Sequence, residues 1–128
     1  DRDEDADRQT VRESAGILHR AGVRFALTSD ESPSPSRYLW YQAATAVRQG
    51  VPREEALRAI TLHAARILGI ADRVGSLEKG KDANLLLLTG DPLSSATWVD
   101  RVILEGEVVY ERKDDRKLKR LVEGEKGK

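Results

Sequence analysis

Cysteine is absent from the 128 residues of this chain. Its absence excludes disulfide bonds, thiolate zinc sites and cysteine nucleophiles. It leaves the compartment open, because cytosolic and periplasmic domains can both lack cysteine.

An excess of charge of one sign is also lacking. The chain has 22 Lys and Arg against 22 Asp and Glu, so its net charge is zero with histidine neutral. Non-specific binding to nucleic acid or to an anionic membrane depends on excess positive charge. We therefore expect neither nucleic acid nor a membrane as a partner. Charged residues make up 34% and hydrophobic residues 39%, which is typical of a globular domain.

Long hydrophobic runs and a secretory leader are missing as well. No apolar stretch approaches the roughly 20 residues of a membrane-spanning helix. The first five residues, Asp1–Asp5, are mostly acidic, which is the reverse of the basic start of a signal peptide. The expected location is the cytoplasm. The start on Asp1 in place of Met is expected for an internal or shortened fragment.

The first half of the chain has helical and extended patterns in succession. Apolar residues recur at helical spacing over Asp7–Ala21, Gly22 is a typical helix stop, and the apolar run Val23–Thr28 follows at once. This run predicts a parallel strand buried on both faces. Further helices are expected at Arg37–Gln49 and from Pro52 to Leu68. A helix joined closely to a buried strand indicates an α/β fold.

The second half is rich in β-forming residues. Short strands are predicted at Ala83–Leu88, Val99–Leu104 and Glu107–Tyr110. Between the last two, Glu105-Gly106 predicts a hairpin turn, because glycine can take a positive φ. The second half is therefore expected to form a small β unit.

A charged tail closes the chain. Arg112–Lys128 has eight basic and four acidic side chains and is expected to be a solvated end. Leu118, Leu121 and Val122 could anchor part of it as a helix. Binding of single-stranded nucleic acid would favour aromatic residues in this region, and the tail has none.

Asp30 is the candidate site residue that the pattern itself selects. It ends the apolar run from Val23 and precedes the Ser/Pro loop Glu31–Ser36. An acid at the carboxyl end of a parallel strand lies where α/β folds build their sites. Asp30 could be a metal ligand, a general base or only a loop residue that caps the next turn. The residues alone leave these three roles open.

The two histidines do not complete a metal site with Asp30. His63 is predicted on or near the packed side of its helix, where a role in packing or at the surface is favoured over a ligand role. His19 lies on another helix and is predicted to face solvent. A first-row metal needs three or four protein ligands. These residues do not supply a convincing set.

A phosphate-binding loop at Gly75–Asp82 is disfavoured by its spacing. Lys81 follows Gly80, as in the P-loop motif, but Asp82 stands where the motif has a hydroxyl residue. A predicted strand also follows, where the motif requires a helix.

Two long segments resemble one family of enzymes. Glu54–Gly69 is similar to the helix that follows the catalytic barrel in the amidohydrolase superfamily, and Gly75–Leu85 is similar to that family's return into its small β domain. Gly90–Leu93 and Val102–Tyr110 resemble the closing strands of that domain. The resemblance runs from about Ala15 to Tyr110 and is greatest to imidazolonepropionase-like and prolidase-like members.

The resemblance implies the architecture. Residues 1–70 would be the last helix-strand-helix part of a (β/α)8 barrel, 71–111 the C-terminal strands of a small composite β-sandwich domain, and 112–128 the charged tail. A typical barrel has roughly 250 residues, so about three quarters of it is absent from this sequence. In the family, strands from the N-terminus complete the β domain. The implied partner is therefore the missing N-terminal barrel portion or a second copy of the chain.

The resemblance also implies the chemistry. The family hydrolyses a C–N bond in a small amide, cyclic amide or dipeptide with one or two divalent metals, expected here to be zinc. By position Asp30 matches the aspartate that ends the eighth barrel strand, and would act as metal ligand and proton shuttle. Ser32 in the following loop would contact the substrate. The sequence has no His-x-His and no bridging-ligand candidate, so the chain alone is expected to be inactive.

The alternative interpretation is not enzymatic. The chain would then be an assembly or dimerisation module that derives from a truncated or split amidohydrolase. The absence of the other metal ligands from the sequence favours this interpretation for the chain taken by itself.

Overall fold

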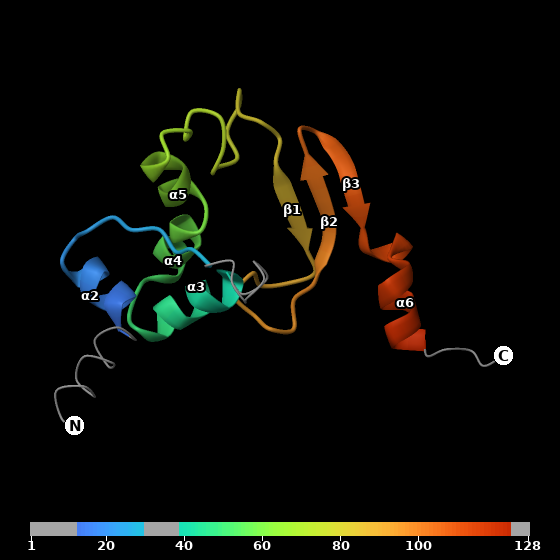
Figure 1. Ribbon diagram of the computed structural model, residues 1–128, viewed down its shortest axis with the longest axis horizontal. Helices are drawn as coiled ribbons and strands as arrows, with labels where there is room; N and C mark the ends of the chain where they lie inside the picture. Colours follow the sequence, from blue (N-terminus) through green and yellow to red (C-terminus); the bar gives the residue numbers. More distant parts are fainter. Residues whose placement is uncertain (1–12, 30–38, 124–128) are drawn as a thin grey trace. The chain divides into compact units, whose positions relative to one another are not determined.

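The computed structural model describes residues 13–29 and 39–123 (Figure 1). The chain divides into two compact units, Asp1–Ser76 and Leu77–Lys128, here called unit 1 and unit 2. The described part of unit 1 is helical, and unit 2 holds a three-stranded sheet and a C-terminal helix. The small β unit expected from the second half is present, whereas the first half, which was expected to be α/β, is helical in its described part.

Unit 1 contains four short helices in its described part. They are α2 (Ser14–Arg20), α3 (Leu39–Arg48), α4 (Arg53–Ala59) and α5 (Leu62–Ile67). The helix α4 contacts both α3 and α5, and α2 contacts α3. Every helix expected in the described part of unit 1 is found, but one of them is divided.

The prediction of one helix from Pro52 to Leu68 is wrong. The helix is interrupted between α4 and α5, where Thr61 has φ −134° and ψ −95°. The Thr61 hydroxyl donates a hydrogen bond of 2.8 Å to the carbonyl oxygen of Leu57. Threonine side chains can bond to nearby backbone in this way and compete with the helical pattern, and the β-branched pair Ile60-Thr61 is also a weak helix former.

The predicted helix stops at Gly22 and Gly69 are confirmed. These glycines have φ values of 71° and 73°, in the left-handed region. The amide of the next residue reaches back to the carbonyl five positions earlier, at 3.0 Å for Val23 and 2.9 Å for Ile70. This bond defines the Schellman motif, which satisfies carbonyls at a helix end and favours glycine.

The prediction of a buried strand at Val23–Thr28 is wrong. The segment forms no strand, and Val23 is 49% exposed. A buried parallel strand satisfies its backbone groups through neighbouring strands, and the described ranges of unit 1 contain no such neighbour. One backbone bond ties the segment to α4 near the segment's end, from the amide of Leu27 to the carbonyl of Ala59 at 3.1 Å.

The core of unit 1 is made of small side chains. Its buried members are Ala15, Ala43, Ala46, Val51, Ala56, Ala59 and Ala65. Gly16 lies in the same packed region, and a Cβ there would come within 2.2 Å of the carbonyl oxygen of Gln49. Larger apolar side chains lie outside this core, and Leu68 is 71% exposed. The helices therefore approach closely but leave apolar surface open.

Unit 2 is built on an antiparallel meander. Its strands are β1 (Leu85–Leu88), β2 (Val99–Leu104) and β3 (Glu107–Glu111), in the order β1-β2-β3 (Figure 1). All three predicted strands are thus confirmed, with ends that shift by up to two residues. The sheet leaves apolar side chains open to solvent, among them Leu86, Leu104 and Val109.

The predicted hairpin turn at Glu105-Gly106 is also confirmed. Its φ values of 52° and 86° are both positive, as in a type I′ turn. The amide of Glu105 donates to the Oδ1 atom of Asn84 at 2.7 Å, and the amide of Gly106 donates to the carbonyl of Ala83 at 3.1 Å. The tip of the hairpin is therefore bound to the residues that enter β1.

The tail continues as a short 3-10 turn, η2 (Arg112–Asp114), and a helix, α6 (Arg116–Glu123). The expected helix is present, but only Leu118 of the three expected anchors is half-buried. Leu121 and Val122 are 83% and 74% exposed. The helix depends instead on capping at its first turn.

Asp115 caps α6. Its Oδ1 atom accepts hydrogen bonds from the amides of Lys117 and Leu118 at 2.9 and 3.0 Å. The Tyr110 hydroxyl donates to the other carboxylate oxygen at 3.1 Å. These bonds, the one from the Leu118 amide first, lower the pKa of Asp115. Partial burial and the bond to Asp115 raise the pKa of Tyr110.

We expect α6 to lose stability in acid. Because the pKa of Asp115 is lower in the folded state, the cap stabilises α6 above the unfolded pKa of about 4 and is lost as the pH falls through the folded value. Amide chemical shifts of residues 116–122 measured against pH would show this. Asp115→Asn retains a capping oxygen without a titrating group, so it should remove the acid transition. An unchanged transition in that variant would contradict this role of Asp115.

Candidate functional site

Asp30 and Ser32, the two site residues selected from the sequence, lie outside the described residues. Their assignments stay predictions. The described chain leads up to Asp30 through Val23–Ser29. The backbone bond between Leu27 and Ala59 holds this segment against the C-terminal end of α4.

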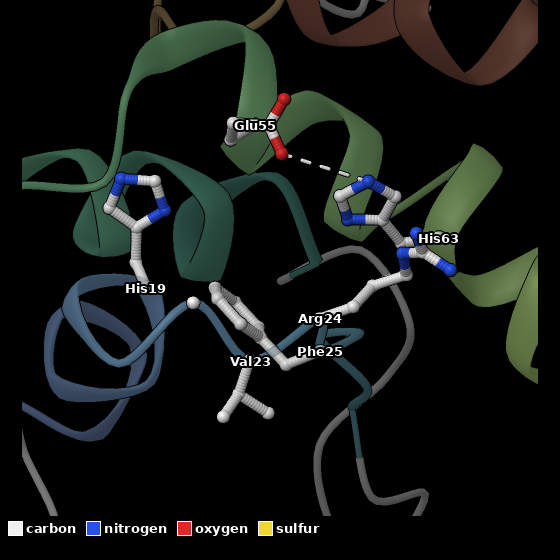
Figure 2. A pocket seen from close by; sticks show the side chains of 7 residues that line it. His19, Val23, Arg24, Phe25, Glu55 and His63 are labelled. Carbon is white, nitrogen blue, oxygen red and sulfur yellow. Dashed lines mark ion pairs between the residues drawn. The ribbon is translucent and has the colours of Figure 1, made fainter.

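The start of the same segment borders an open pocket with a cavity volume of about 290 Å³ (Figure 2). The pocket is lined by His19, Gly22, Val23, Arg24, Phe25, Glu55 and His63. These residues come from α2, from the segment that follows it, and from α4 and α5. The sequence pattern places the two histidines on different helices and does not predict that they line one pocket.

Glu55 is the acidic residue among those that line this pocket. Its Oε1 atom accepts a hydrogen bond from Nη1 of Arg58 at 2.6 Å. Its Oε2 atom lies 3.6 Å from Nε2 of His63 (Figure 2). Arg58 also reaches Glu54, with 3.5 Å between Nη2 and Oε2. The carboxylate of Glu55 is therefore already shared between a guanidinium and an imidazole.

The positions of the histidines agree only in part with the prediction. The His63 side chain is 12% exposed, which confirms its place on the packed side of its helix. His19 was predicted to face solvent and is half-buried instead. The reason is that the chain reverses at Gly22 and brings Val23–Phe25 alongside the histidine in the pocket wall.

The pocket does not have the composition of a metal centre. Among residues 13–29 and 39–123, no group of three or more His, Cys, Asp or Glu could hold a metal ion. A structural or catalytic zinc ion needs three or four protein ligands. The described residues therefore do not fit the metal that the family resemblance implies. The Glu55–His63 pair is best explained as packing between α4 and α5.

No helix in the part of the chain that the structure describes is both long and apolar enough to cross a membrane.

The sequence model of the Amidohydrolase family matches residues 2–109, which is most of this chain. The chain belongs to the amidohydrolase family. This confirms the resemblance that the segments Glu54–Gly69 and Gly75–Leu85 indicated.

Two curated relatives are more than a third identical to this chain over the region that aligns. The N-substituted formamide deformylase of Arthrobacter pascens is 38% identical over 109 residues, which cover 72% of this chain and 20% of the relative. An imidazolonepropionase of Pseudomonas aeruginosa strain UCBPP-PA14 is 39% identical over 114 residues, which cover 80% of this chain and 28% of the relative. This amidohydrolase chain thus spans about a quarter of the length of these relatives.

Solved amidohydrolase structures show the same partial coverage. An amidohydrolase from Thermotoga maritima is 40% identical with a TM-score of 0.75, over 79% of this chain and 26% of that one. A Xaa-Pro dipeptidase is 28% identical with a TM-score of 0.69, over 79% and 25%. The described fold is therefore a partial α/β amidohydrolase structure.

Proposed function

We propose that the complete protein to which this chain contributes is a metal-dependent hydrolase of C–N bonds. Its substrate would be a small amide, a cyclic amide or a dipeptide. The observation that supports this most strongly is the similarity to the Thermotoga maritima amidohydrolase, at 40% identity and a TM-score of 0.75. The deformylase, imidazolonepropionase and Xaa-Pro dipeptidase relatives give the three substrate classes to test.

Asp30 is the residue of this chain that we propose for the chemistry. It follows Val23–Ser29, a segment that the Leu27 backbone bond ties to α4. A carboxylate at this point could accept the proton of an attacking water molecule and return it to the leaving nitrogen. Ser32, two residues further along, is proposed to contact the substrate.

The proposed metal site needs more ligands than the described residues of this chain supply. The proposed ion or ions, expected to be zinc, are not accounted for by the described residues, which hold no suitable ligand group. Asp30 would add one carboxylate. We therefore propose that the remaining ligands come from the N-terminal barrel portion that the family resemblance implies.

The exposed apolar surface of each unit supports such a partner. In unit 1, Ile67 and Leu68 at the end of α5 are open to solvent, and in unit 2, Leu86 and Val109 on the sheet are open as well. Contiguous exposed apolar surface marks interaction sites. The N-terminal barrel portion would cover these side chains. A second copy of the chain is the alternative.

The test is to purify the protein from its own source and to measure native mass, metal content and hydrolysis. An N-substituted formamide, an imidazolone and a Xaa-Pro dipeptide would serve as substrates. We expect a longer chain or a co-purifying partner, stoichiometric metal and turnover of at least one substrate. A metal-free particle built only from this chain and inactive on all three would refute the proposal. That result would favour the assembly module.

A further inference from the structure

Helix α6 lies outside the part of the chain that the family match explains. The match ends at residue 109, and α6 spans Arg116–Glu123. Its residue pattern is therefore not accounted for by the amidohydrolase fold, and it needs an explanation of its own.

The helix is amphipathic and strongly basic. At 3.6 residues per turn, Leu118, Leu121 and Val122 fall on one side. The basic residues Arg116, Lys117, Lys119 and Arg120 cover the remainder of its circumference, against a single acid in the sequence of the helix. Leu121, at 83% exposed, is the most exposed large apolar side chain of the described residues, and Val122 is 74% exposed. An apolar stripe that is open to solvent at Leu121 and Val122 and half-buried at Leu118 thus lies next to concentrated positive charge.

The contacts of its first turn keep α6 helical before any partner binds. The Asp115 carboxylate caps the first turn of α6 through the amides of Lys117 and Leu118, and the Tyr110 hydroxyl links that carboxylate to the end of β3. A helix that is already formed loses less conformational freedom on binding than a flexible tail. The apolar and basic sides are therefore presented in a fixed arrangement.

We propose that α6 attaches the protein to an anionic lipid surface. The helix lies in the plane of the interface, with Leu118, Leu121 and Val122 toward the acyl chains and the basic side chains at the level of the headgroups. A nucleic acid would bind the basic side chains and leave the apolar stripe uncovered. A neutral protein groove would cover the apolar stripe and leave the basic side chains without a partner of opposite charge. An anionic lipid surface uses both.

This proposal revises the expectation that no membrane is a partner. That expectation was based on the net charge of the whole chain, which is zero. The charge on α6 is local, and surface attraction acts within about one Debye length of the lipid headgroups. Three apolar side chains give a weak and reversible attachment, so the protein is expected to exchange between the lipid surface and solution.

Co-sedimentation of the full chain with vesicles tests the proposal. Vesicles of phosphatidylcholine and phosphatidylserine in equal parts are compared with vesicles of phosphatidylcholine alone. We expect binding to the anionic vesicles to be stronger by about tenfold or more, and to decrease as salt is raised. Equal binding to both kinds of vesicle, or to neither, would overturn the proposal.

Paired variants separate the stripe from the charge. Leu121→Gln with Val122→Gln removes the stripe but keeps a good helix former, and Lys119→Gln with Arg120→Gln removes two charges. Each pair should reduce vesicle binding by about tenfold. Arg66→Gln with Lys79→Gln removes two exposed charges outside α6 and should leave binding within about twofold of wild type. Far-UV circular dichroism confirms that each variant remains folded.

Two outcomes would point to other partners. If the stripe variants bind anionic vesicles as wild type does, the attraction is only electrostatic, and α6 does not lie in the interface. If the chain binds duplex DNA more tightly than vesicles, and only the charge variants weaken that binding, the basic surface serves nucleic acid. Either result would overturn the proposal.

Discussion

Replacing Gly75 with alanine is expected to lower the free energy of unfolding by roughly 2 to 5 kcal/mol. Gly75 has a φ of 94°, a conformation that strains any residue with a Cβ. The added carbon would also lie 2.7 Å from the Cβ of Ala65 and 3.0 Å from the Cα of Leu62. Ala65 is buried and the Leu62 atom belongs to the backbone, so neither can move aside easily.

Gly69→Ala is the matched control for this prediction. Gly69 also has a positive φ, 73°, but a Cβ there would meet no atom within 4 Å. Its substitution should cost only the backbone strain, about 1–2 kcal/mol. Urea denaturation followed by far-UV circular dichroism gives both values. Equal losses in the two variants would show that the close approach at Gly75 does not stabilise unit 1.

Asp30→Asn in the complete protein is expected to lower kcat by about 10²–10⁴-fold. The amide has nearly the same shape as the carboxylate, but it cannot accept a proton from water. The change should fall mainly on kcat, because the proposed role is proton transfer and not substrate binding. Steady-state kinetics on whichever of the three substrates is turned over would measure it.

Asp72→Asn is a suitable control for that experiment. Asp72 is an exposed acid of unit 1 that has no role in the proposed chemistry, and its substitution removes the same charge. We expect its kcat to remain within about twofold of wild type. Turnover near the wild-type rate in Asp30→Asn would remove Asp30 from the chemistry. A folded Asp30→Asn protein that has also lost metal would favour a ligand role.

Local sequence signals predicted the parts of the fold that depend on local interactions. Gly22 and Gly69 end helices because a left-handed residue is needed there. The turn at Glu105-Gly106 was predictable for the same reason. The strand expected at Val23–Thr28 was not found, because a strand depends on distant partners that the apolar run cannot specify. The helix break at Thr61 depends on a hydroxyl bond that competes with helical spacing.

The candidate site was predictable only in part. Asp30 was selected by its position after an apolar run and by the family resemblance, and it lies outside the described residues. The pairing of Glu55 with His63 was missed, because the change of direction between α4 and α5 brings them together and helical periodicity does not encode it. Arg24 lines the same pocket from a segment whose apolar pattern predicts a buried strand.

The contact between the hairpin tip and Asn84 helps to determine how β1 aligns with β2. The strand β1 is four consecutive leucines, Leu85–Leu88, whose side chains are identical in every alignment. A shift of one residue would turn each leucine to the opposite face without changing the pattern on either. Such a shift would, however, carry Asn84 away from the Glu105 amide. Asn84 at one end of the strand and the hydrogen bonds between Thr89 and Trp98 at the other therefore favour one register for a uniform run of leucines.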